Sequence, residues 1–444
     1  MSSESGGRSG DIGLFDAVAI EVGLIVGGAL FSLTGVAVAI TGPGVVVAFA
    51  IAFSIAILGL VPTAMLGSVY PTTGGNYRYP ARFVSPALAF LAAWGLAISM
   101  FGGGLPLYAL TAGQYVDAIV AVDPTAVGLA MLTGFFLVNL RGIRPAAQVQ
   151  TLMFVALVAA LGAFVVFGVP AVEVANLRPT FTGGPVGLVT AAGVLYFVCL
   201  GANFVVDIGG EVRDATLTIP RSFAVSVPLV LGLYALLGFV AVGSVGAEAM
   251  AGETLAVAAE AFLPASLRAT FIVGGALFAI ATSVNAVFII APKYVAVLAA
   301  DGLVPPALAR RNERFGTPHW GLALVYVVSV AALVSPIPVD QLGSLLGFGG
   351  AFLVVPVMAA AIHVVRHRPS GFDPAAFPLS PRLVGGMAAF AIPLNLCLLV
   401  LLATTAPRVF AGWLALLAIG GVYYVARSRL RPQPETPPAL RPEP

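Results

Sequence analysis

Charged side chains are scarce in this sequence. Asp, Glu, Lys and Arg make up 9% of its 444 residues, whereas a soluble globular protein carries about 25%. Hydrophobic residues reach 59%, and the mean hydropathy is +1.03. So little charge excludes an ordinary soluble domain. We therefore expect an all-α integral membrane protein that crosses the bilayer many times.

Cysteine and histidine are also rare, and their positions argue against several kinds of site. The two cysteines, Cys199 and Cys397, lie inside apolar runs, so no disulfide framework is indicated. The three histidines lie near the ends of apolar runs without metal-ligand spacing. The sequence has no nucleophile elbow and no repeated filter-like segment. These absences argue against an intramembrane enzyme and against an ion channel or passive pore.

Long apolar runs fill most of the chain. A helix of about 20 apolar residues crosses the roughly 30 Å hydrocarbon core of a bilayer. Length and hydropathy predict twelve transmembrane helices, at Leu14–Ile40, Val45–Leu66, Pro86–Leu110, Pro124–Leu140, Ala146–Phe167, Gly187–Ile208, Arg221–Val245, Leu267–Leu298, Gly321–Val334, Gln341–Val365, Val384–Thr404 and Val409–Val425.

The basic residues predict the orientation. If the N-terminus is cytoplasmic, 18 of the 21 lysines and arginines lie inside, and only Arg178, Arg268 and Arg408 lie outside. We therefore expect the cell membrane as the location, with both termini in the cytoplasm. The polar residues 1–10 and the proline-rich residues 426–444 are expected to form disordered tails.

The stretch Val22–Phe31, VGLIVGGALF, contains Gly23, Gly27 and Gly28. Glycine weakens a helix by about 1 kcal/mol relative to alanine. Backbone groups left unpaired inside lipid cost several kcal/mol more. An interruption of the first helix here indicates a cavity in which a ligand pairs the freed groups. The alternative is that the glycines allow another helix to pack closely.

A second interruption is predicted in the sixth helix, where Gly201 lies at mid-span and Gly209–Gly210 end the run. The first and sixth helices each begin a block of five, and paired interrupted helices indicate a transporter binding site. Freed N–H groups at a helix start suit a carboxylate, and freed carbonyls suit an ammonium group. Together they favour a zwitterion such as an α-amino acid.

Four motifs, in this order, resemble the amino acid–polyamine–organocation (APC) transporter superfamily. They are VGLIVGGALF, PTTGGNYRYPARF at 71–83, EVRDATLTIPRS at 211–222, and GALFAIATSVNAVF followed by LAADGLVPPAL within 275–308. The resemblance covers about residues 10–425. It implies twelve helices in a five-plus-five inverted repeat, the leucine-transporter-type fold with two extra C-terminal helices. The transporter domain is then expected at 11–425, with the repeats at 11–168 and 187–366 and the extra helices at 382–425.

The resemblance also implies a substrate site. The carboxylate is expected at N–H groups near Gly27 to Ala29, where Ala29 replaces the second glycine that the motif often has. The amine is expected at carbonyls around Phe197, which stands where relatives often keep an aromatic gate. Cys199 and Ala202 are expected to shape the side-chain pocket. The predicted substrate-binding residues are Val26, Gly27, Gly28, Ala29, Phe197, Val198, Cys199, Leu200, Gly201 and Ala202.

The coupling ion stays open between sodium and a proton. Some relatives carry a lysine in the fifth helix that couples transport to protons, and this chain has none near Leu157. Thr282 and Ser283 match the hydroxyl pair of the sodium site in sodium-coupled relatives, with carbonyls of Gly23 and Val26. The alternative for both hydroxyls is ordinary hydrogen bonding within or between helices.

Glu21 lies about 10 Å inside the membrane boundary, two residues before Gly23. An ionisable group at this depth is a functional candidate, which could attract a cation or carry a proton. The alternative is an acid in an aqueous vestibule that pairs with Arg213 or Arg221. For Asp207, nearer the end of the sixth helix, a structural role is favoured.

These observations predict a secondary transporter for amino acids that works by alternating access. Neutral or apolar substrates are favoured because the residues around the interruption of the sixth helix are apolar. Cationic amino acids or polyamines are the alternative substrates, and a non-transporting amino-acid sensor or an ion channel is the alternative from another class. We expect no enzymatic activity, no cofactor beyond Na⁺ or H⁺, and no nucleic-acid partner; the bilayer and a small substrate are the partners, and the oligomeric state is not indicated.

Overall fold

The computed structural model describes residues 12–117, 120–373 and 376–430, and helices make up most of them. Two isolated bridges, Ile12 to Val212 and Thr73 to Ile208, are the only β-type pairings in this part of the chain. The predicted tail at 1–10 and residues 431–444 of the predicted tail at 426–444 lie outside the described residues. Residues 426–430 are helical instead, as the end of α18.

The α-helices begin and end as follows: α1 (Leu14–Ile25), α2 (Gly28–Thr41), α3 (Val45–Val69), α4 (Gly75–Phe83), α5 (Pro86–Ser99), α6 (Leu105–Asp117), α7 (Pro124–Leu140), α8 (Ile143–Gly168), α9 (Gly184–Tyr196), α10 (Ala215–Val245), α11 (Ala247–Met250), α12 (Leu255–Phe262), α13 (Ala265–Phe271), α14 (Phe278–Ala300), α15 (His319–Leu333), α16 (Val339–His367), α17 (Pro381–Thr405) and α18 (Pro407–Leu430).

Shorter helical segments join several of these helices. Two of them, η2 (Met100–Gly104) and η7 (Ile272–Leu277), are π-helical turns that connect α5 to α6 and α13 to α14. The 3₁₀ segments are η1 (Gly42–Gly44), η3 (Val169–Ala171), η4 (Val174–Leu177), η5 (Phe197–Asp207), η6 (Gly209–Glu211) and η8 (Pro306–Ala309).

Nine helical stretches of the described residues are long and apolar enough to cross a membrane. One of them, Leu33–Val69, joins parts of two predicted helices through the Gly-Pro-Gly turn η1. The helices α7 and α15 are apolar but shorter. The chain is therefore a multi-span membrane protein, and the count of twelve crossings and the inverted repeat stay predictions.

The helix boundaries differ from the predicted ones by several residues. A helix or an interrupted helix overlaps each of the twelve predicted ranges. Helix α10 begins at Ala215, six residues before the predicted start at Arg221. Helix α18 continues to Leu430, five residues beyond the predicted end of the transporter domain. Amphipathic ends of this kind are missed by hydropathy, because polar residues can extend a helix into water.

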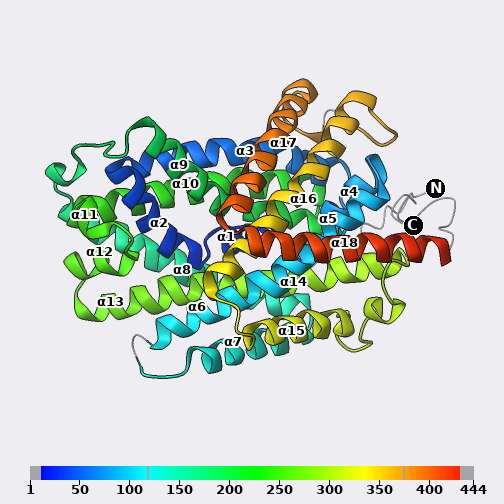
Figure 1. The fold of residues 1–444 in the computed structure, drawn as a ribbon, viewed down its shortest axis with the longest axis horizontal. Coiled ribbons are helices and arrows are strands. Elements are labelled where there is room, and N and C mark those ends of the chain that lie inside the picture. The colour runs from blue at the N-terminus through cyan, green and yellow to red at the C-terminus, as the bar shows by residue number, and fades with distance from the viewer. Residues whose placement is uncertain (1–11, 118–119, 374–375, 431–444) are drawn as a thin grey trace, which may run out of the picture.

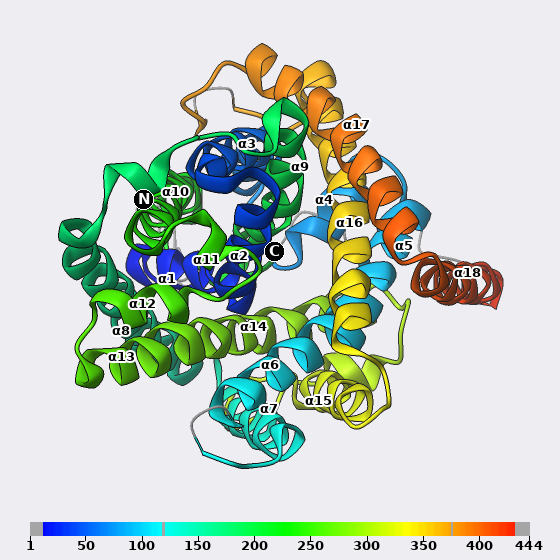
Figure 2. The same cartoon turned by 60° about the vertical axis from the view of Figure 1, so that its left-hand side comes forward.

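Most helices run along the long axis of the molecule (Figure 1). Helix α4 lies at one end and the short helices α11 and α12 lie at the other (Figure 1). Turning the molecule shows α1 on the inside of the bundle, whereas α17 and α18 lie along its outer edge (Figure 2). Helix α1 contacts α8, α10, α14 and η5, and its residues from Ala17 to Gly23 are buried. The bundle therefore surrounds the predicted site on the first helix.

The outer helices present apolar side chains to their surroundings. Phe390 on α17 is 72% exposed, and Val422 on α18 is 71% exposed. In water such a surface would be unfavourable, at roughly 25 cal/mol per Å² of apolar area. In a bilayer it is solvated by lipid, which fits a membrane-embedded bundle.

Connecting segments meet at the end of the bundle that carries α4. Ile12 N donates to Glu211 O at 3.1 Å, which attaches the start of the described chain to η6. Tyr77 Oη donates to Asp301 Oδ2 at 2.8 Å, which joins α4 to the loop after α14. Arg427 Nε donates to Gly302 O at 2.9 Å. These contacts close the bundle at this end. It carries Arg78 and Arg82 of α4 and Arg427 of α18, and we call it the arginine-rich end.

Candidate functional site

The first predicted helix is interrupted where its glycines lie. Helix α1 ends at Ile25, helix α2 begins at Gly28, and Gly27 is the extended residue that precedes α2. Across the gap, Gly27 N donates to Ile25 O at 3.0 Å, and Leu30 N donates to Gly27 O at 3.1 Å. Val26 is buried between the two halves. The backbone thus leaves the α-helical path at the positions predicted.

The sixth predicted helix also changes its geometry, beginning four residues before the interruption predicted at Gly201. Helix α9 ends at Tyr196, and the chain continues as the 3₁₀ segment η5 from Phe197 to Asp207. The longer rise of a 3₁₀ helix and its different hydrogen-bond pattern alter which carbonyls are available. The two interrupted helices touch: a Cβ atom at Gly201 would lie 2.4 Å from the backbone C and O atoms of Leu24.

The interruption of the first helix leaves backbone groups with distinct partners. Ile25 O accepts the hydroxyl of Tyr234 on α10 at 2.8 Å, in addition to Gly27 N. At the other side of the gap, Leu30 N bonds Gly27 O, and the two N–H groups before it, at the start of α2, have no carbonyl of a preceding helical turn to bond. Gly27 provides no side chain to cap them. The start of α2 is therefore an arrangement suited to a carboxylate.

Several predicted substrate-binding positions lie outside the described side chains. The structure describes the backbone path at Gly28, Ala29, Phe197, Val198 and Leu200, but not their side chains. The aromatic gate at Phe197 and the binding roles of this group stay predictions.

The other two predicted pocket residues lie in the core. Cys199 is buried, and its Sγ donates to Leu195 O at 3.3 Å. Ala202 is fully buried as well.

An apolar cavity lies beside the interrupted helices. Its volume is about 40 Å³, and its lining includes Leu24 of α1, Phe204 of η5 and Met100 of η2. Helix α14 contributes further residues, among them Ile290 and Tyr294. Neither Cys199 nor Ala202 lines it. The cavity offers space for apolar atoms and contains no charged side chain.

The predicted sodium ligands come together in part. Ser283 Oγ on α14 donates to Gly23 O at 2.7 Å, which joins a predicted hydroxyl to a predicted carbonyl. Thr282 Oγ1 donates instead to Ala279 O at 2.8 Å within its own helix. These are hydrogen bonds of the kind expected for hydroxyl groups in membrane helices. An ion here would have to replace the contact between Ser283 and Gly23.

Close packing explains one of the glycines of the first helix. A Cβ atom at Gly23 would lie 2.1 Å from Gln150 Nε2 of α8 and 2.9 Å from Thr282 Cβ of α14. Gly23 therefore allows two helices to approach α1, whereas Gly27 lies in the interruption itself. A Cβ atom at Gly27 would also lie 2.8 Å from Ser283 Oγ, so both interpretations of the glycine-rich stretch apply to Gly27.

Glu21 is fully buried on the face of α1 that meets α10. Ser222 Oγ contacts Glu21 Oε1 at 2.7 Å, and Ser226 Oγ contacts Glu21 Oε2. None of the ion pairs within the described residues involves Glu21. The alternative of an exposed acid paired with Arg213 or Arg221 is therefore not what the structure contains.

The two serines can serve both protonation states of Glu21. Ser222 Oγ also lies 2.8 Å from Ile219 O. A serine hydroxyl carries one hydrogen, so it donates either to Glu21 or to Ile219. When it donates to Ile219, the carboxyl of Glu21 has to supply the proton for its own contact with Ser222. The site can therefore hold Glu21 charged or neutral without moving a helix.

Several buried polar residues escaped the sequence-based predictions. Ser222 and Ser226 are four residues apart on α10, a spacing that places both on one helix face. Two polar residues at that spacing in an apolar run could have predicted a helix face that bonds a buried polar group. Tyr234 lies two turns further along α10. No pattern in the sequence indicated its hydrogen bond, because its acceptor, Ile25 O, is 209 residues away.

A chain of amide groups crosses four helices next to Gly23. Asn139 Nδ2 of α7 donates to Asn285 Oδ1 of α14 at 2.9 Å, and Asn285 Nδ2 donates to Gln150 Oε1 of α8 at 2.9 Å. Gln150 Nε2 then donates to Ala19 O of α1 at 3.2 Å. The uncharged amide of Gln150 is thus a polar group that the fifth predicted helix presents to the first, next to Gly23.

Asp207 has the structural role that was favoured for it. Its two carboxylate oxygens accept from Asn76 N and Asn76 Nδ2, both at 2.8 Å. Its backbone oxygen accepts from Gly74 N at 2.9 Å. These bonds attach the PTTGGNYRYP loop to the end of η5.

Comparison with known families gives a match over nearly the whole chain. The amino acid permease family matches residues 12–425. This range contains both interrupted helices, the apolar cavity and Glu21. The described site thus lies within the region that the family defines.

Individual relatives are more distant but cover most of the chain. An uncharacterized transporter of Mycobacterium tuberculosis is 28% identical over 388 residues, which is 86% of each chain. A branched-chain amino acid permease of Bacillus subtilis is 24% identical and covers 84% of this chain and 85% of its own. A vacuolar cationic amino acid transporter of Arabidopsis thaliana is 26% identical over 82% of this chain and 61% of its own. All three are transporters or permeases and none is an enzyme.

Proposed function

We propose that this chain, which belongs to the amino acid permease family, moves amino acids with apolar side chains across the cell membrane. The observation that carries the substrate class is the cavity beside the interrupted helices, which Leu24 and Phe204 help to line and whose lining has no charged side chain. An ammonium group on a substrate side chain would find no acid there. The name of the branched-chain permease among the relatives supports the same class.

The mechanism proposed is alternating access, in which the substrate and the coupling ion shift the balance between outward-open and inward-open states. The N–H groups at the start of α2 bind the carboxylate, and carbonyls of η5 bind the ammonium group. The inverted repeat is supported by two pairs of matching features. The first and sixth predicted helices are both interrupted, and the third and eighth both contain a π-helical turn.

The orientation proposed puts the arginine-rich end of the bundle in the cytoplasm. Support comes from the distribution of basic residues, since cytoplasmic loops carry most lysines and arginines. The loop after α14, with Arg310 and Arg311, and the loop after α16, with Arg368, lie at this end.

For coupling, we propose a proton carried by Glu21. The carboxyl is buried, bonds only hydroxyl groups, and can be satisfied in either protonation state through Ser222. Two other titratable groups near α1 bond elsewhere: Tyr234 donates to Ile25 O, and Asp16 accepts from Thr151 Oγ1. Sodium bound by Gly23, Val26, Thr282 and Ser283 is the competing proposal. It is supported less, because Thr282 is directed at its own helix.

A second substrate class has one observation in its favour. Two of the relatives at 26% identity are named as cationic amino acid transporters of Arabidopsis thaliana. A cationic substrate needs a carboxylate near its side chain, and Glu21 is the buried acid nearest the interruption in sequence. Both carboxylate oxygens of Glu21 already accept hydrogen bonds from serine hydroxyl groups, which makes a cationic substrate the weaker alternative.

Uptake into proteoliposomes tests the proposal. Purified protein would be reconstituted and offered labelled L-leucine or L-arginine, under an inward proton gradient and separately under an inward sodium gradient. We expect saturable leucine accumulation that requires the proton gradient. Accumulation of arginine without leucine would establish the cationic alternative, and sodium-dependent accumulation would move the coupling to Thr282 and Ser283. Leucine binding without uptake would indicate a sensor, and flux without saturation would indicate a channel.

A further inference from the structure

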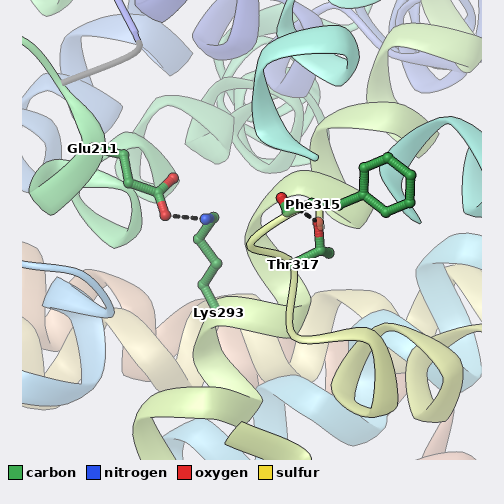
Figure 3. Close-up of polar contacts among 4 residues, drawn as sticks. All are labelled: Glu211, Lys293, Phe315 and Thr317. Carbon is green, nitrogen blue, oxygen red and sulfur yellow. Dashed lines mark hydrogen bonds and ion pairs between the residues drawn. The ribbon is translucent and has the colours of Figure 1, made fainter. Parts of the chain in front are cut away.

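A partly buried ion pair joins η6 to α14 at the arginine-rich end of the bundle. Lys293 on α14 pairs with Glu211 of η6, and the two side chains are only 12% and 17% exposed (Figure 3). Lys293 is the single lysine of the whole sequence. The pair connects the segment after the interrupted sixth helix to the helix that carries Thr282 and Ser283. It therefore bridges the elements that form the candidate site.

A polar cavity of about 200 Å³ lies against this ion pair. Its walls come from α7, α8, α14, η6 and the loop before α15. Figure 3 shows Glu211 and Lys293 pointing toward each other, with Phe315 and Thr317 on the adjoining loop. In liquid water one molecule takes about 30 Å³. The cavity is thus larger than a single-water site and differs from the apolar cavity near the interruption.

The cavity presents charges of both signs. Lys293 and Arg311 are positive, and Glu211 is negative. Glu211 Oε2 is buried and accepts no hydrogen bond within the described residues. Asn139 Nδ2 already gives its two hydrogens to Phe135 O and Asn285 Oδ1, so Asn139 can offer the cavity only its oxygen, an acceptor. Two positively charged hydrogen-bond donors, Lys293 and Arg311, and two acceptors, Glu211 and Asn139, thus line one small cavity.

We propose that this cavity is a second amino-acid site, occupied by a substrate molecule after it leaves the interrupted helices toward the cytoplasm. The proposal rests on the proposed function. The α-carboxylate binds Arg311 and Lys293, and the α-ammonium binds Glu211. Because Lys293 changes its partner from Glu211 to the ligand, the ligand replaces the bridge between η6 and α14 with contacts of its own. The site recognises the groups that all α-amino acids share.

The chain of amides gives the cavity a physical link to the first helix. Asn139 lines the cavity, and through Asn285 and Gln150 its hydrogen bonds lead to Ala19 O on α1. Occupation of the cavity would therefore affect a hydrogen bond on α1 that lies two residues from Glu21. Through this link, substrate bound at the second site from the cytoplasm would influence the return of the transporter to the outward-open state.

The single lysine provides a direct test that does not depend on transport. Purified full-length protein in detergent would be treated with an amine-reactive reagent, and modification of Lys293 would be measured by mass spectrometry. We expect L-leucine to protect Lys293 at least fivefold. Leucinamide, which lacks the carboxylate, and inorganic phosphate at equal concentration should not protect. Equal protection by leucinamide would overturn the proposal, and stronger protection by phosphate would show a simple anion site instead.

Two arginines of one loop supply a matched pair of variants. Arg311→Gln removes a lining cation, and at least fivefold more leucine should then be needed for protection. Arg310→Gln changes an exposed neighbour that does not line the cavity, and protection should be unchanged. If the two variants behave alike, the assignment of the carboxylate to Arg311 is wrong.

A third variant separates this cavity from the interrupted helices. Gly27→Ala places a Cβ atom 2.8 Å from Ser283 Oγ, which should weaken leucine binding at the first site. Protection of Lys293 should persist in this variant. If Gly27→Ala lost protection of Lys293 while Arg311→Gln kept it, protection would come from leucine at the first site, and the proposal would be wrong. Failure of the proposed function would appear separately, as an absence of leucine uptake by wild-type proteoliposomes.

Discussion

Gly201 lets the backbones of two interrupted helices come into contact. A Cβ atom there would lie 2.4 Å from Leu24 C and 2.6 Å from Ile25 N, both of them backbone atoms. Real Cβ atoms do not approach a backbone so closely, and a backbone segment moves less easily than the end of a side chain. The residue type at this position therefore controls how near the proposed carboxylate and ammonium receptors lie to each other.

We expect Gly201→Ala to destabilise the protein and to slow leucine uptake. Forcing a methyl group into a packed interior typically costs about 1–3 kcal/mol. The apparent melting temperature in detergent and the initial uptake rate would measure both effects. Gly193→Ala is the control, since Gly193 lies in α9 with open space around it and alanine is the better helix former. Equal behaviour of the two variants would contradict the close contact.

The positions at which glycine interrupts a helix were easier to predict from the sequence than the hydrogen-bond partners of polar side chains. The interruption at Gly27 was predictable because glycine has a local effect on its own helix. In the sixth helix the prediction was Gly201, and the 3₁₀ segment that contains it begins four residues earlier, at Phe197. The partners of Glu21 were not, because Ser222 is 201 residues away and the sequence does not show which face of α10 meets α1. For the same reason Tyr234 was missed as the residue that bonds Ile25 O.

At the scale of elements, a chain of amides joins α7, α14, α8 and α1. Asn285 is its centre, because it bonds Asn139, Gln150 and Ala146 O at 2.9–3.0 Å. All three amide side chains are buried. Buried polar groups in a membrane protein have no water as an alternative partner, so each depends on its neighbours. The chain fixes how these helices lie around Gly23.

Asn285→Leu should therefore destabilise the bundle strongly, although leucine has a similar size. The substitution leaves Gln150 Oε1 and one N–H of Asn139 without a partner, at about 1–3 kcal/mol for each buried group. Thermal unfolding in detergent would measure the loss. The control is Ser329→Ala on α15, which removes only a hydroxyl bonded within its own helix to Val325 O. A loss no larger than that of the control would show that the amides do not act as a network.

Element boundaries were predictable only where the chain itself marks them. Helix α7 begins at Pro124 and ends at Leu140 as predicted, because proline and a charged residue bound the apolar run. The π-helical turns at η2 and η7 were not predicted. Such a turn depends on how neighbouring helices pack on glycine-rich segments, which periodicity does not reveal.

For the whole molecule, composition determined the class and the family comparison established the kind of activity. The low charge content predicted a membrane protein, and nine helical stretches among the described residues are long and apolar enough to span a bilayer. The match to the amino acid permease family confirms the resemblance seen in the four motifs. The substrate and the coupling ion are set by a few buried contacts, and these remain proposals.

The proposed alternating access requires that some contacts between helices break in each cycle. The ion pair between Lys293 and Glu211 and the hydrogen bond between Tyr77 and Asp301 both cross the arginine-rich end. In the proposed mechanism both open before a substrate leaves on that side. A proton on Glu21 is the proposed link between this movement and an energy source.

Proton movement during leucine uptake tests that link most directly. Proteoliposomes with a pH-sensitive dye inside, and with no initial pH gradient, would receive external leucine while a potassium diffusion potential holds the interior negative. We predict that leucine entry acidifies the interior in the wild type and in the Asp16→Asn control. In Glu21→Gln, whose side chain carries no transferable proton, the acidification should fall at least tenfold while exchange of internal for external leucine persists. Leucine entry without acidification in the wild type, or an unchanged signal in Glu21→Gln, would contradict proton coupling through Glu21.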